Sequence, residues 1–245
     1  MDSANAQPSI SVIIPTYNHA DALVGCLQSI FNQTVPVKEI IVIDDGSRDG
    51  THHVLIPFLS RIQYVYQENA GAPAARNHGF RISHGDLVIF CDADVIMQPN
   101  MLQKMTTTLT AHPEASFSYS GFQFGWKRFK GLPYTTARLH ETNFIHTTSL
   151  VRRTAFPSFD EQIKRLQDWD LWLTMSEQGN VGVCASEAPL FHVRIDGASR
   201  IGSSWLPKFF YRFPWQKIGW APKNMQRYLD ARNVLTKKHP KMRAL

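Results

Sequence analysis

Residues 85–94 of the chain read GDLVIFCDAD, and this stretch decides which fold the sequence can form. The apolar run Leu87–Cys91 predicts a short strand that is buried on both faces. The run ends at two carboxylates, Asp92 and Asp94, which Ala93 separates. Ligands of open α/β sheets bind beyond the carboxyl ends of the strands, so these carboxylates stand where a ligand would bind. They suit Mg²⁺ or Mn²⁺, although an isolated Asp-x-Asp is more often a polar turn.

The stretch belongs to a regular alternation of strands and helices over residues 1–111. Short apolar or β-branched runs predict strands at Ile10–Ile14, Ile40–Ile43, Ile62–Tyr66 and Leu87–Cys91. Apolar residues at helical spacing predict helices at about 21–32, 50–59, 73–82 and 100–111. This order favours right-handed βαβ crossovers. We therefore predict an α/β fold with a Rossmann-like, mostly parallel central sheet and helices on both faces.

Local signals predict where several of these elements end. Pro15 is expected to stop the first strand. Asp49 can cap the helix that follows, and Pro57 can end that helix early. Gly179 is expected to stop a helix at 168–178.

The second half of the chain is less regular. Strands are predicted at 115–124, 147–151, 181–184 and 190–193, and residues 126–134 are predicted to form a basic, aromatic loop. A basic helix is predicted at 224–238.

Composition indicates a soluble globular protein. The chain has 245 residues and no apolar run of the length of a membrane span. Residues 1–8 are polar, lack the features of a signal peptide, and are expected to be a disordered tail. The three cysteines are widely separated and odd in number, which favours a reducing, cytoplasmic setting.

The net charge of +6 is concentrated at the C-terminus. Residues 200–245 carry 11 Lys and Arg against one acid, Asp230. Aromatic residues lie among these cations, so 201–245 could contact a membrane surface or an acidic partner. Equally, the aromatic residues could pack on the core while the cations are solvated. No nucleic-acid-binding module accompanies the charge, so we expect no nucleic-acid partner.

Single motifs leave their function open. Asp44 and Asp45 end a predicted strand and could accept from a base or a ribose, or form an Asx turn before Gly46. Arg76 follows a run of small residues and could bind a diphosphate, or lie on a solvated helix face.

Further candidates are equally ambiguous from spacing alone. Asp168 could be a general base or a helix-capping acid, with Asp170 as its rival. His192 could complete a metal site, although a lone histidine is more often structural. The histidines at 52, 53 and 146 have weaker functional cases.

Together, several motifs resemble the family 2 glycosyltransferases of the GT-A fold. In order they are SVIIPTYN at 11–18, VIDDGSRDGT at 42–51, NAGAPAARNHG at 69–79 and DAD at 92–94. Later, SLVRR at 149–153, FDE at 159–161 and QDWDLWL at 167–173 look like that family's acceptor-side half. Each motif is weak alone, but their joint occurrence is specific. The resemblance implies a GT-A domain at 9–200 with a nucleotide-binding half at 9–111, an acceptor-binding half at 112–200, and a basic extension at 201–245.

The resemblance implies inverting transfer of a sugar from a nucleotide-diphosphate sugar, with UDP-sugar as the expected donor. The acceptor would be a saccharide, a lipid-linked group or another hydroxyl compound, and the pathway would make a surface polysaccharide or glycoconjugate. The enzyme would be cytoplasmic, with a peripheral contact at the inner face of the membrane as an open option.

The resemblance also implies roles for individual residues. Thr16 and Asp45 would contact the base, with Asp44 nearby, and Arg76 would support the nucleotide. Asp92 would face the ribose or the metal, and Asp94 would hold Mn²⁺ or Mg²⁺. Asp168 would be the catalytic base. The remaining expected contacts are Pro15, Tyr17, Asn18 and Ala93 to the nucleotide, His192 to the metal, and Gln167, Trp169 and Asp170 to the acceptor.

One departure from the family pattern is Gln167, which stands where the family usually has Glu. A non-catalytic nucleotide-sugar-binding relative is therefore an alternative. A dinucleotide-dependent oxidoreductase fits less well, because no Gly-x-Gly-x-x-Gly follows the first strand.

Overall fold

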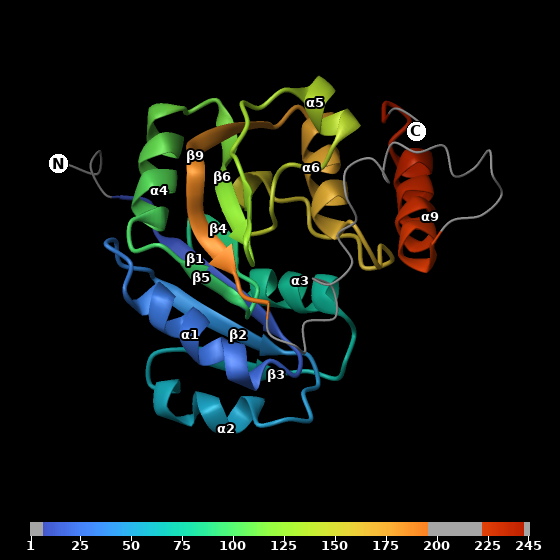
Figure 1. The fold of residues 1–245 in the computed structure, drawn as a ribbon. Coiled ribbons are helices and arrows are strands. Elements are labelled where there is room, and N and C mark those ends of the chain that lie inside the picture. The colour runs from blue at the N-terminus through green and yellow to red at the C-terminus, as the bar shows by residue number, and fades with distance from the viewer. Residues whose placement is uncertain (1–6, 196–221, 243–245) are drawn as a thin grey trace.

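Strand β1 (Ile10–Thr16) lies in the middle of the part of the sheet that the first ninety residues build. A computed structural model describes residues 7–195 and 222–242, and Figure 1 shows the sheet between two layers of helices. The other strands of this part are β2 (Glu39–Asp44), β3 (Gln63–Tyr66) and β4 (Leu87–Phe90). β2 and β4 flank β1, β3 follows β2, and all four are parallel. The predicted parallel arrangement is confirmed.

The second half of the chain extends the same sheet with mixed strand directions. The described sheet has nine strands in the order β3-β2-β1-β4-β8-β6-β9-β5, with β7 paired to β6. The added strands are β5 (Val95–Met97), β6 (Ala115–Phe124), β7 (Lys127–Phe129), β8 (Leu150–Arg152) and β9 (Val181–Val193). β8 is antiparallel to both β4 and β6, and β9 is parallel to β6. β6 and β9 therefore run in the direction of β1, and their carboxyl ends lie at the same edge.

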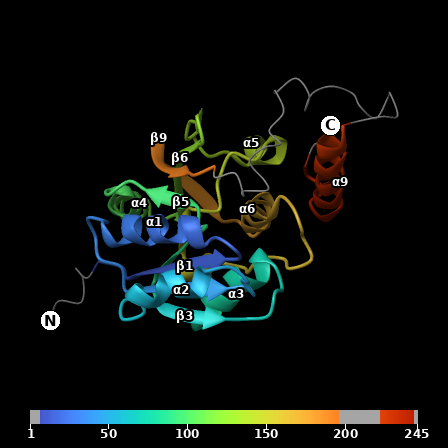
Figure 2. The same ribbon diagram turned by 60° about the horizontal axis from the view of Figure 1, so that its bottom comes forward.

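Helices cover both faces of the sheet, as predicted (Figure 2). The helices are α1 (Ala20–Phe31), α2 (Thr51–Leu55), α3 (Ala72–Ile82), α4 (Met101–Ala111), α5 (Thr136–Glu141), α6 (Gln167–Glu177) and α9 (Lys223–Lys238). Leu23 and Leu27 of α1 and Met105 of α4 join one buried cluster. Trp169 and Trp172 of α6 belong to a second cluster, against β4, β6 and β8. Because side chains alternate between the two faces of a strand, the central strands contribute residues to both clusters.

The prediction that Pro15 stops the first strand is wrong, because β1 continues to Thr16. The backbone oxygen of Ile13 accepts from the N–H of Cys91, so Ile13 and Pro15 both face β4. β4 ends at Phe90, which pairs with Ile13. No strand therefore remains on that side for the missing N–H of Pro15 to bond, and proline is tolerated there.

Three other differences arise from tertiary pairing. The two strands predicted at 181–184 and 190–193 are one strand, β9, whose register against β6 shifts repeatedly and absorbs Pro189. Residues 127–129, predicted as a loop, form β7 in a hairpin with β6. β5 and α5 are too short to give a periodic signal.

The two predicted helix-end signals, Gly179 and Asp49, have different outcomes in the structure. Gly179 ends α6 with φ of +86°, as expected, and its N–H bonds the carbonyl of Ser176. Asp49 precedes the N-cap of α2 and accepts from the N–H of Thr51 at 3.0 Å. Its other oxygen accepts from the N–H of Ala20 at 3.1 Å. Asp49 thus serves the first residues of two helices.

A buried group of charged side chains holds α9 against α6. Both ring nitrogens of His239 lie 2.9 Å from carboxylate oxygens, of Asp170 and of Glu177. The ammonium group of Lys238 lies 2.8 Å from Asp160 and 2.9 Å from Asp170. His239 is 1% exposed, so its contact with Asp170 is shielded from water, whereas the side chains of Lys238 and Asp160 remain 34% and 32% exposed. In the basic extension predicted at 201–245, the described residues 222–242 are thus joined to the folded body.

Other predictions for the chain ends fall largely outside the described residues. Residues 1–6, 196–221 and 243–245 are not described, which includes most of the predicted tail at 1–8 and the aromatic part of the extension. Among the helices in the described ranges, none is both long and apolar enough to cross a membrane.

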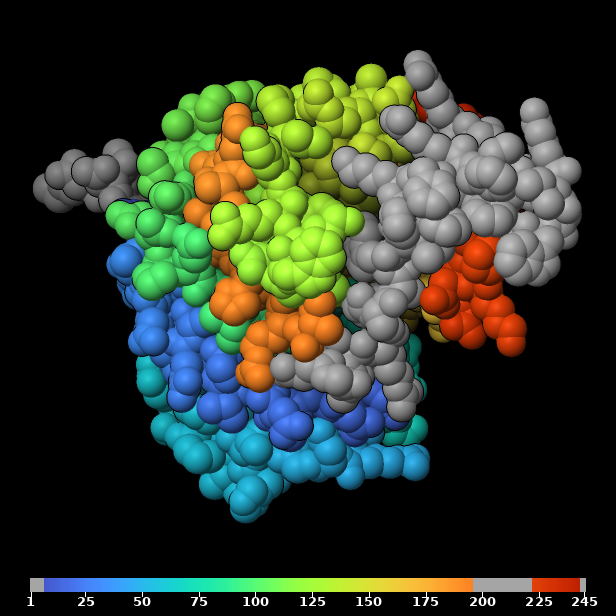
Figure 3. Space-filling view, in the orientation of Figure 1, coloured from blue at the N-terminus to red at the C-terminus, as the bar shows by residue number. Residues whose placement is uncertain are grey.

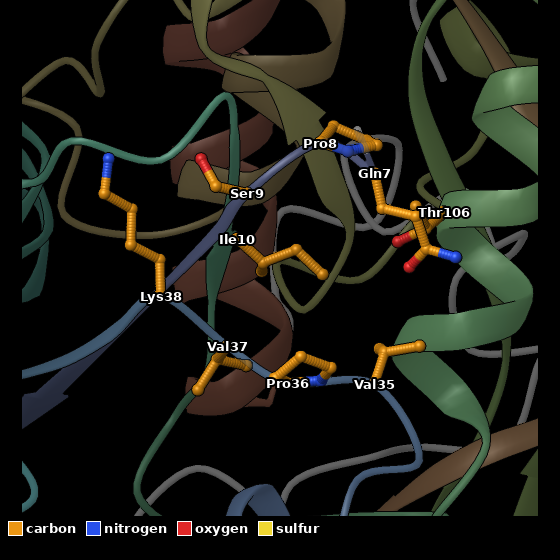
Figure 4. A pocket seen from close by; sticks show the side chains of 9 residues that line it. All are labelled: Gln7, Pro8, Ser9, Ile10, Val35, Pro36, Val37, Lys38 and Thr106. Atoms are coloured by element: carbon orange, nitrogen blue, oxygen red, sulfur yellow. The ribbon is translucent and has the colours of Figure 1, made fainter. Parts of the chain in front are cut away.

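A shallow groove lies near the amino ends of β1 and β2, and Figure 4 shows the side chains that line it. Its lining includes Ser9, Ile10, Val37, Lys38 and Thr106. Ligands of open α/β sheets bind at the opposite, carboxyl edge of the strands. The groove therefore lies away from the expected site.

The contact between α9 and α6 should make stability depend on pH. Burial lowers the pKa of His239, but hydrogen bonds to Asp170 and Glu177 outweigh it and raise that pKa. A raised folded-state pKa gives stabilisation that is full below the unfolded pKa and is lost as pH rises through the folded pKa. We expect His239→Gln to cost about 3 kcal/mol near pH 6 and less near pH 9, measured by urea unfolding.

The matched control is Lys237→Gln on the exposed side of α9, which should change stability by less than about 0.5 kcal/mol at both values of pH. An equal cost of His239→Gln at both values of pH would contradict a charged imidazole in the contact.

Candidate active site

Arg76 joins the two halves of the domain at the carboxyl edge of the sheet. Its Nη2 donates to Oδ1 of Asp92 at 2.7 Å, just beyond β4, and its Nη1 donates to Oε1 of Gln167 at 3.1 Å, at the start of α6. The guanidinium carbon lies 5.2 Å from the ring centre of Phe159. Arg76 is 6% exposed, so the predicted solvated alternative does not hold. The structure therefore brings two predicted site residues, Asp92 and Gln167, into contact with a third, the buried Arg76.

The motif at 69–79 has a physical reason at each fixed position. Gly71 precedes α3 with φ of +94°, which favours glycine. A Cβ at Gly79 would collide with Ile13, so glycine lets α3 approach β1 closely. The amide of Asn77 exchanges two 2.9 Å hydrogen bonds with the backbone of Phe159. The motif thus fixes Arg76 against both the sheet and the segment before α6.

The charge of Arg76 controls the ionisation of Asp92. Burial raises the pKa of Asp92, but the charge of Arg76, helped by its hydrogen bond, holds that pKa below its usual value. The side chain of Asp92 remains 31% exposed. Asp92 is consequently an anion that still faces solvent at the edge of the sheet.

Asp44 and Asp45 are both buried, and both organise loops at this edge. Asp44 accepts from the N–H of Ser47, three residues on, at 2.8 Å, so the turn is one residue longer than the predicted Asx turn; it also accepts from the hydroxyl of Tyr64. Asp45 accepts from the N–H groups of Ala70 and Gly71 at 2.9 and 2.8 Å. These carboxylates shape the place where a base would bind, and direct contact with the base stays a prediction.

The loop after β1 is tied to the loop after β2. The backbone N–H of Asn18 donates to Ser47, and the side-chain oxygen of Asn18 accepts from the N–H of Arg48. Tyr17 is 42% exposed, and the hydroxyl of Thr16 is buried with no hydrogen-bond partner among the described residues. Pro15, Thr16, Tyr17 and Asn18 therefore lie at the expected edge, with an unpaired hydroxyl and an exposed ring.

Asp168 lies in the first turn of α6, next to Gln167, and is half-buried. Its Oδ2 accepts from the amide of Asn143 at 2.8 Å, and its Oδ1 accepts from the backbone N–H of Trp169. Asn143 precedes β8, so the acceptor-side half itself orients this carboxylate. No pattern in the sequence pointed to Asn143, because its contact is long-range.

His146, which has only a weak functional case from the sequence, lies close to the candidate carboxylates. Its Nδ1 accepts from the N–H of Thr148, and its ring lies 5.0 Å from the rings of Phe122 and Phe191. Burial lowers the pKa of His146, while the charges of Asp92 and Asp168 oppose that shift. His146 therefore sits within electrostatic reach of both carboxylates, and no spacing in the sequence could reveal this.

Trp169 and Asp170 lie away from this group. Trp169 is 1% exposed and its indole N–H donates to the carbonyl of Leu139 at 2.7 Å. Asp170 is 2% exposed and bonded to Lys238 and His239. Their expected role at the acceptor stays a prediction that these contacts do not support.

Of the predicted metal ligands, Asp92 and Asp94 lie in the turn between β4 and β5, and His192 lies on β9. Ala93 is buried, and the half-buried Asp94 follows it. The register of β5 with β9 places His192, which is exposed, diagonally across from Asp94. Within residues 7–195 and 222–242, no three His, Cys, Asp or Glu side chains form a ready metal site. The predicted ligands instead fit a cation that one or two carboxylates hold and whose coordination phosphate and water complete.

Comparison with known proteins agrees with this geometry. The family model described as glycosyl transferase family 2 matches residues 11–166. The uncharacterized glycosyltransferase YibD of Escherichia coli is 38% identical over 106 residues, which cover 42% of this chain and 31% of that protein. The putative glycosyltransferase EpsE of Bacillus subtilis is 29% identical over 209 residues, covering 78% of this chain and 75% of EpsE.

The uncharacterized glycosyltransferase RT0329 of Rickettsia typhi is 28% identical over 183 residues, covering 67% of this chain and 58% of that protein. The matched region is thus less than two thirds of the length of several of these relatives.

Solved structures share the fold. S. aureus TarS 1-349 in complex with UDP superposes with a TM-score of 0.68 at 18% identity, covering 95% of this chain and 81% of that one. Mannosyltransferase PcManGT from Pyrobaculum calidifontis, in complex with GDP-Man and Mn²⁺, gives 0.62 at 19% identity, covering 96% of this chain and 72% of that one. The predicted GT-A fold is confirmed.

The pair of Arg76 and Asp92 should be energetically coupled. Each is partly shielded from water, so removing one partner leaves the other without its counter-charge. In a double-mutant cycle with Arg76→Met and Asp92→Asn, we expect a coupling energy of about 2 kcal/mol in urea unfolding at neutral pH. Asp86→Asn, at the opposite end of β4, is the control and should be additive with Arg76→Met. Additive behaviour of Asp92→Asn would contradict the bridge.

Proposed function

The chain belongs to glycosyl transferase family 2, and from that membership we propose that it transfers a sugar from a nucleotide-diphosphate sugar to an acceptor hydroxyl with inversion. UDP-sugar is the proposed donor, because S. aureus TarS, which shares the fold, was solved in complex with UDP and with UDP-GlcNAc. The observation that supports the proposal most is the Arg76 bridge, because Asp92 and the start of α6 both bond to one buried guanidinium.

Donor binding is assigned to the strand ends of the first half. Thr16, Tyr17 and Asn18 would line the nucleoside, beside the loops that Asp44 and Asp45 hold in place. Arg76 would face the diphosphate on the side of α3, because a buried guanidinium pairs well with phosphate oxygens. The unpaired hydroxyl of Thr16 offers a hydrogen bond that the protein does not satisfy.

A divalent cation, Mn²⁺ or Mg²⁺, would be held by Asp94 and Asp92. PcManGT, which shares the fold, was solved in complex with GDP-Man and Mn²⁺. Arg76 occupies Oδ1 of Asp92, and no hydrogen bond to Oδ2 is recorded in the described part of the chain, so one oxygen is available. When bound, the cation would neutralise charge on the diphosphate leaving group. His192 is assigned as an additional ligand from its position across β5 and β9.

Asp168 is assigned as the general base. Asn143 and the N–H of Trp169 each engage one of its oxygens, so its orientation is fixed while each oxygen keeps a second lone pair. The acceptor hydroxyl would lose its proton to Asp168 as its oxygen attacks the anomeric carbon from the face opposite the diphosphate. A single displacement inverts that carbon and needs no enzyme nucleophile.

Gln167 favours a second reading, a nucleotide-sugar-binding relative without transfer activity. The family usually has Glu at this position, and here the side chain is neutral and accepts from Arg76. The neutral amide leaves the full charge of Arg76 to Asp92. We keep transfer as the first proposal because Asp92, Asp94 and Asp168 are all retained.

The acceptor and the cellular setting extend the proposal. We propose a saccharide or lipid-linked acceptor in the synthesis of a surface polysaccharide or glycoconjugate. We also propose that the basic residues of 201–245 contact the inner face of a membrane, which the strong positive charge of this segment supports.

Substitution of the two acids separates the roles of metal and base. We expect Asp168→Asn to reduce sugar transfer by about a hundredfold or more while UDP affinity stays the same. Asp94→Asn should weaken Mn²⁺-dependent UDP binding, measured by calorimetry. Asp21→Asn, on the exposed first turn of α1, is the control and should change neither quantity. Full transfer activity in both site variants without metal would overturn the assignment.

A further inference from the structure

The tip of the β6–β7 hairpin presents a tryptophan to solvent. Trp126 is 89% exposed, more than any other large hydrophobic residue in the described part of the chain. Large aromatic side chains are enriched where proteins bind ligands, because they offer a broad apolar face at a low entropic cost. A single exposed side chain is not a site, so the surroundings of Trp126 decide its meaning.

The hairpin holds Trp126 on an ordered support. Phe122 and Phe129 stack across the two strands with ring centres 4.7 Å apart and planes 9° apart. Gly125 forms the turn with φ of +54°, and its N–H donates to the carbonyl of Val193 at 3.1 Å. The turn is therefore bonded to β9 as well as closed on itself, which fixes the position of the indole.

Two exposed cations follow the tryptophan along the hairpin. Trp126, Arg128 and Lys130 are exposed, whereas Lys127 and Phe129 between them are half-buried. Neither Arg128 nor Lys130 forms an ion pair within residues 7–195 and 222–242. The exposed face of the hairpin therefore combines one aromatic ring with two positive charges.

The sheet places this face beside the proposed metal ligand. Val95, which follows Asp94, pairs with Val193 of β9, and Val193 pairs with Phe124 of β6. Strand β9 thus separates β5 from β6, and β7, which carries Arg128, lies beyond β6, about 14 Å from β5 at ordinary strand spacing. Figure 3 shows the yellow-green hairpin region at the surface against the orange β9.

We propose that Trp126, Arg128 and Lys130 form a subsite for the acceptor, and that the acceptor is a saccharide carrying an acidic group. The indole offers an apolar face for a sugar ring, and the two cations attract a phosphate or carboxylate on the same molecule. This inference rests on the proposed transferase function and adds the chemical class of the acceptor.

Position favours this reading over two others. The donor is assigned to the ends of β1, β2 and β4, and β8 separates β4 from β6 of the hairpin, so the tryptophan is not required for the nucleotide. An anionic membrane could also attract a tryptophan with two cations. The location at the sheet edge that also carries Asp94 points to a substrate instead, and a membrane contact becomes an outcome of the test.

The experiment measures binding of the full chain to an array of neutral and acidic oligosaccharides, with UDP and Mn²⁺ present. We expect wild type to be retained on acidic saccharides, and Trp126→Ala to weaken that binding about tenfold, which corresponds to about 1.4 kcal/mol. Trp126→Phe should retain most of the binding, and Arg128→Gln with Lys130→Gln should remove the preference for acidic saccharides. Ile56→Ala, which removes an exposed apolar side chain elsewhere, should have no effect.

Two parallel measurements separate the causes of failure. UDP affinity, measured by calorimetry, should be equal in wild type and Trp126→Ala; wild type that binds no UDP would instead defeat the transferase function. UDP binding without retention on acidic saccharides, or retention that Trp126→Ala leaves unchanged, would overturn the subsite. Loss of binding to phosphatidylcholine–phosphatidylglycerol vesicles in Trp126→Ala, with saccharide binding unchanged, would overturn it in favour of a membrane contact.

Discussion

The buried guanidinium of Arg76 is the interaction on which the site depends. Two halves of different architecture meet at its two ends, Asp92 after a parallel strand and Gln167 at the start of α6. Such a cation is costly to bury unless its hydrogen bonds are satisfied. The Asn77 contact and the close approach at Gly79 keep Arg76 there. The spacing within the motif at 69–79 is thus a packing requirement as well as a chemical one.

Elements whose signal is local could be predicted from the sequence, and those that depend on distant pairing could not. The four parallel strands, their helices and the stop at Gly179 follow from short-range patterns. The continuation of β1 through Pro15 depends on where β4 ends, and the unbroken β9 depends on bulges opposite β6. The motifs located Arg76, Asp92 and Asp168, whereas Asn143 was missed and His146 had only a weak case, because both approach the site through the fold.

The acceptor-side half contributes more than a cover for the sheet. Its helix α6 carries Asp168 on one side of its first turn and Asp170 on the other, so one helix serves both the candidate site and the contact with α9. The segment whose charge predicts a basic appendage is therefore partly joined to the helix that carries the proposed base. The hairpin at the far end of the sheet offers a third surface near Asp94.

The central claim is that acidic side chains at several strand ends converge on one pyrophosphate through a divalent ion. Crystals grown with UDP and Mn²⁺, measured at the manganese absorption edge, test this claim most directly. The account predicts one anomalous peak between Asp94 and the diphosphate, with the uracil near Thr16 and Asp45. A nucleotide in the groove at the amino edge of β1, or a manganese peak remote from Asp94, would contradict it.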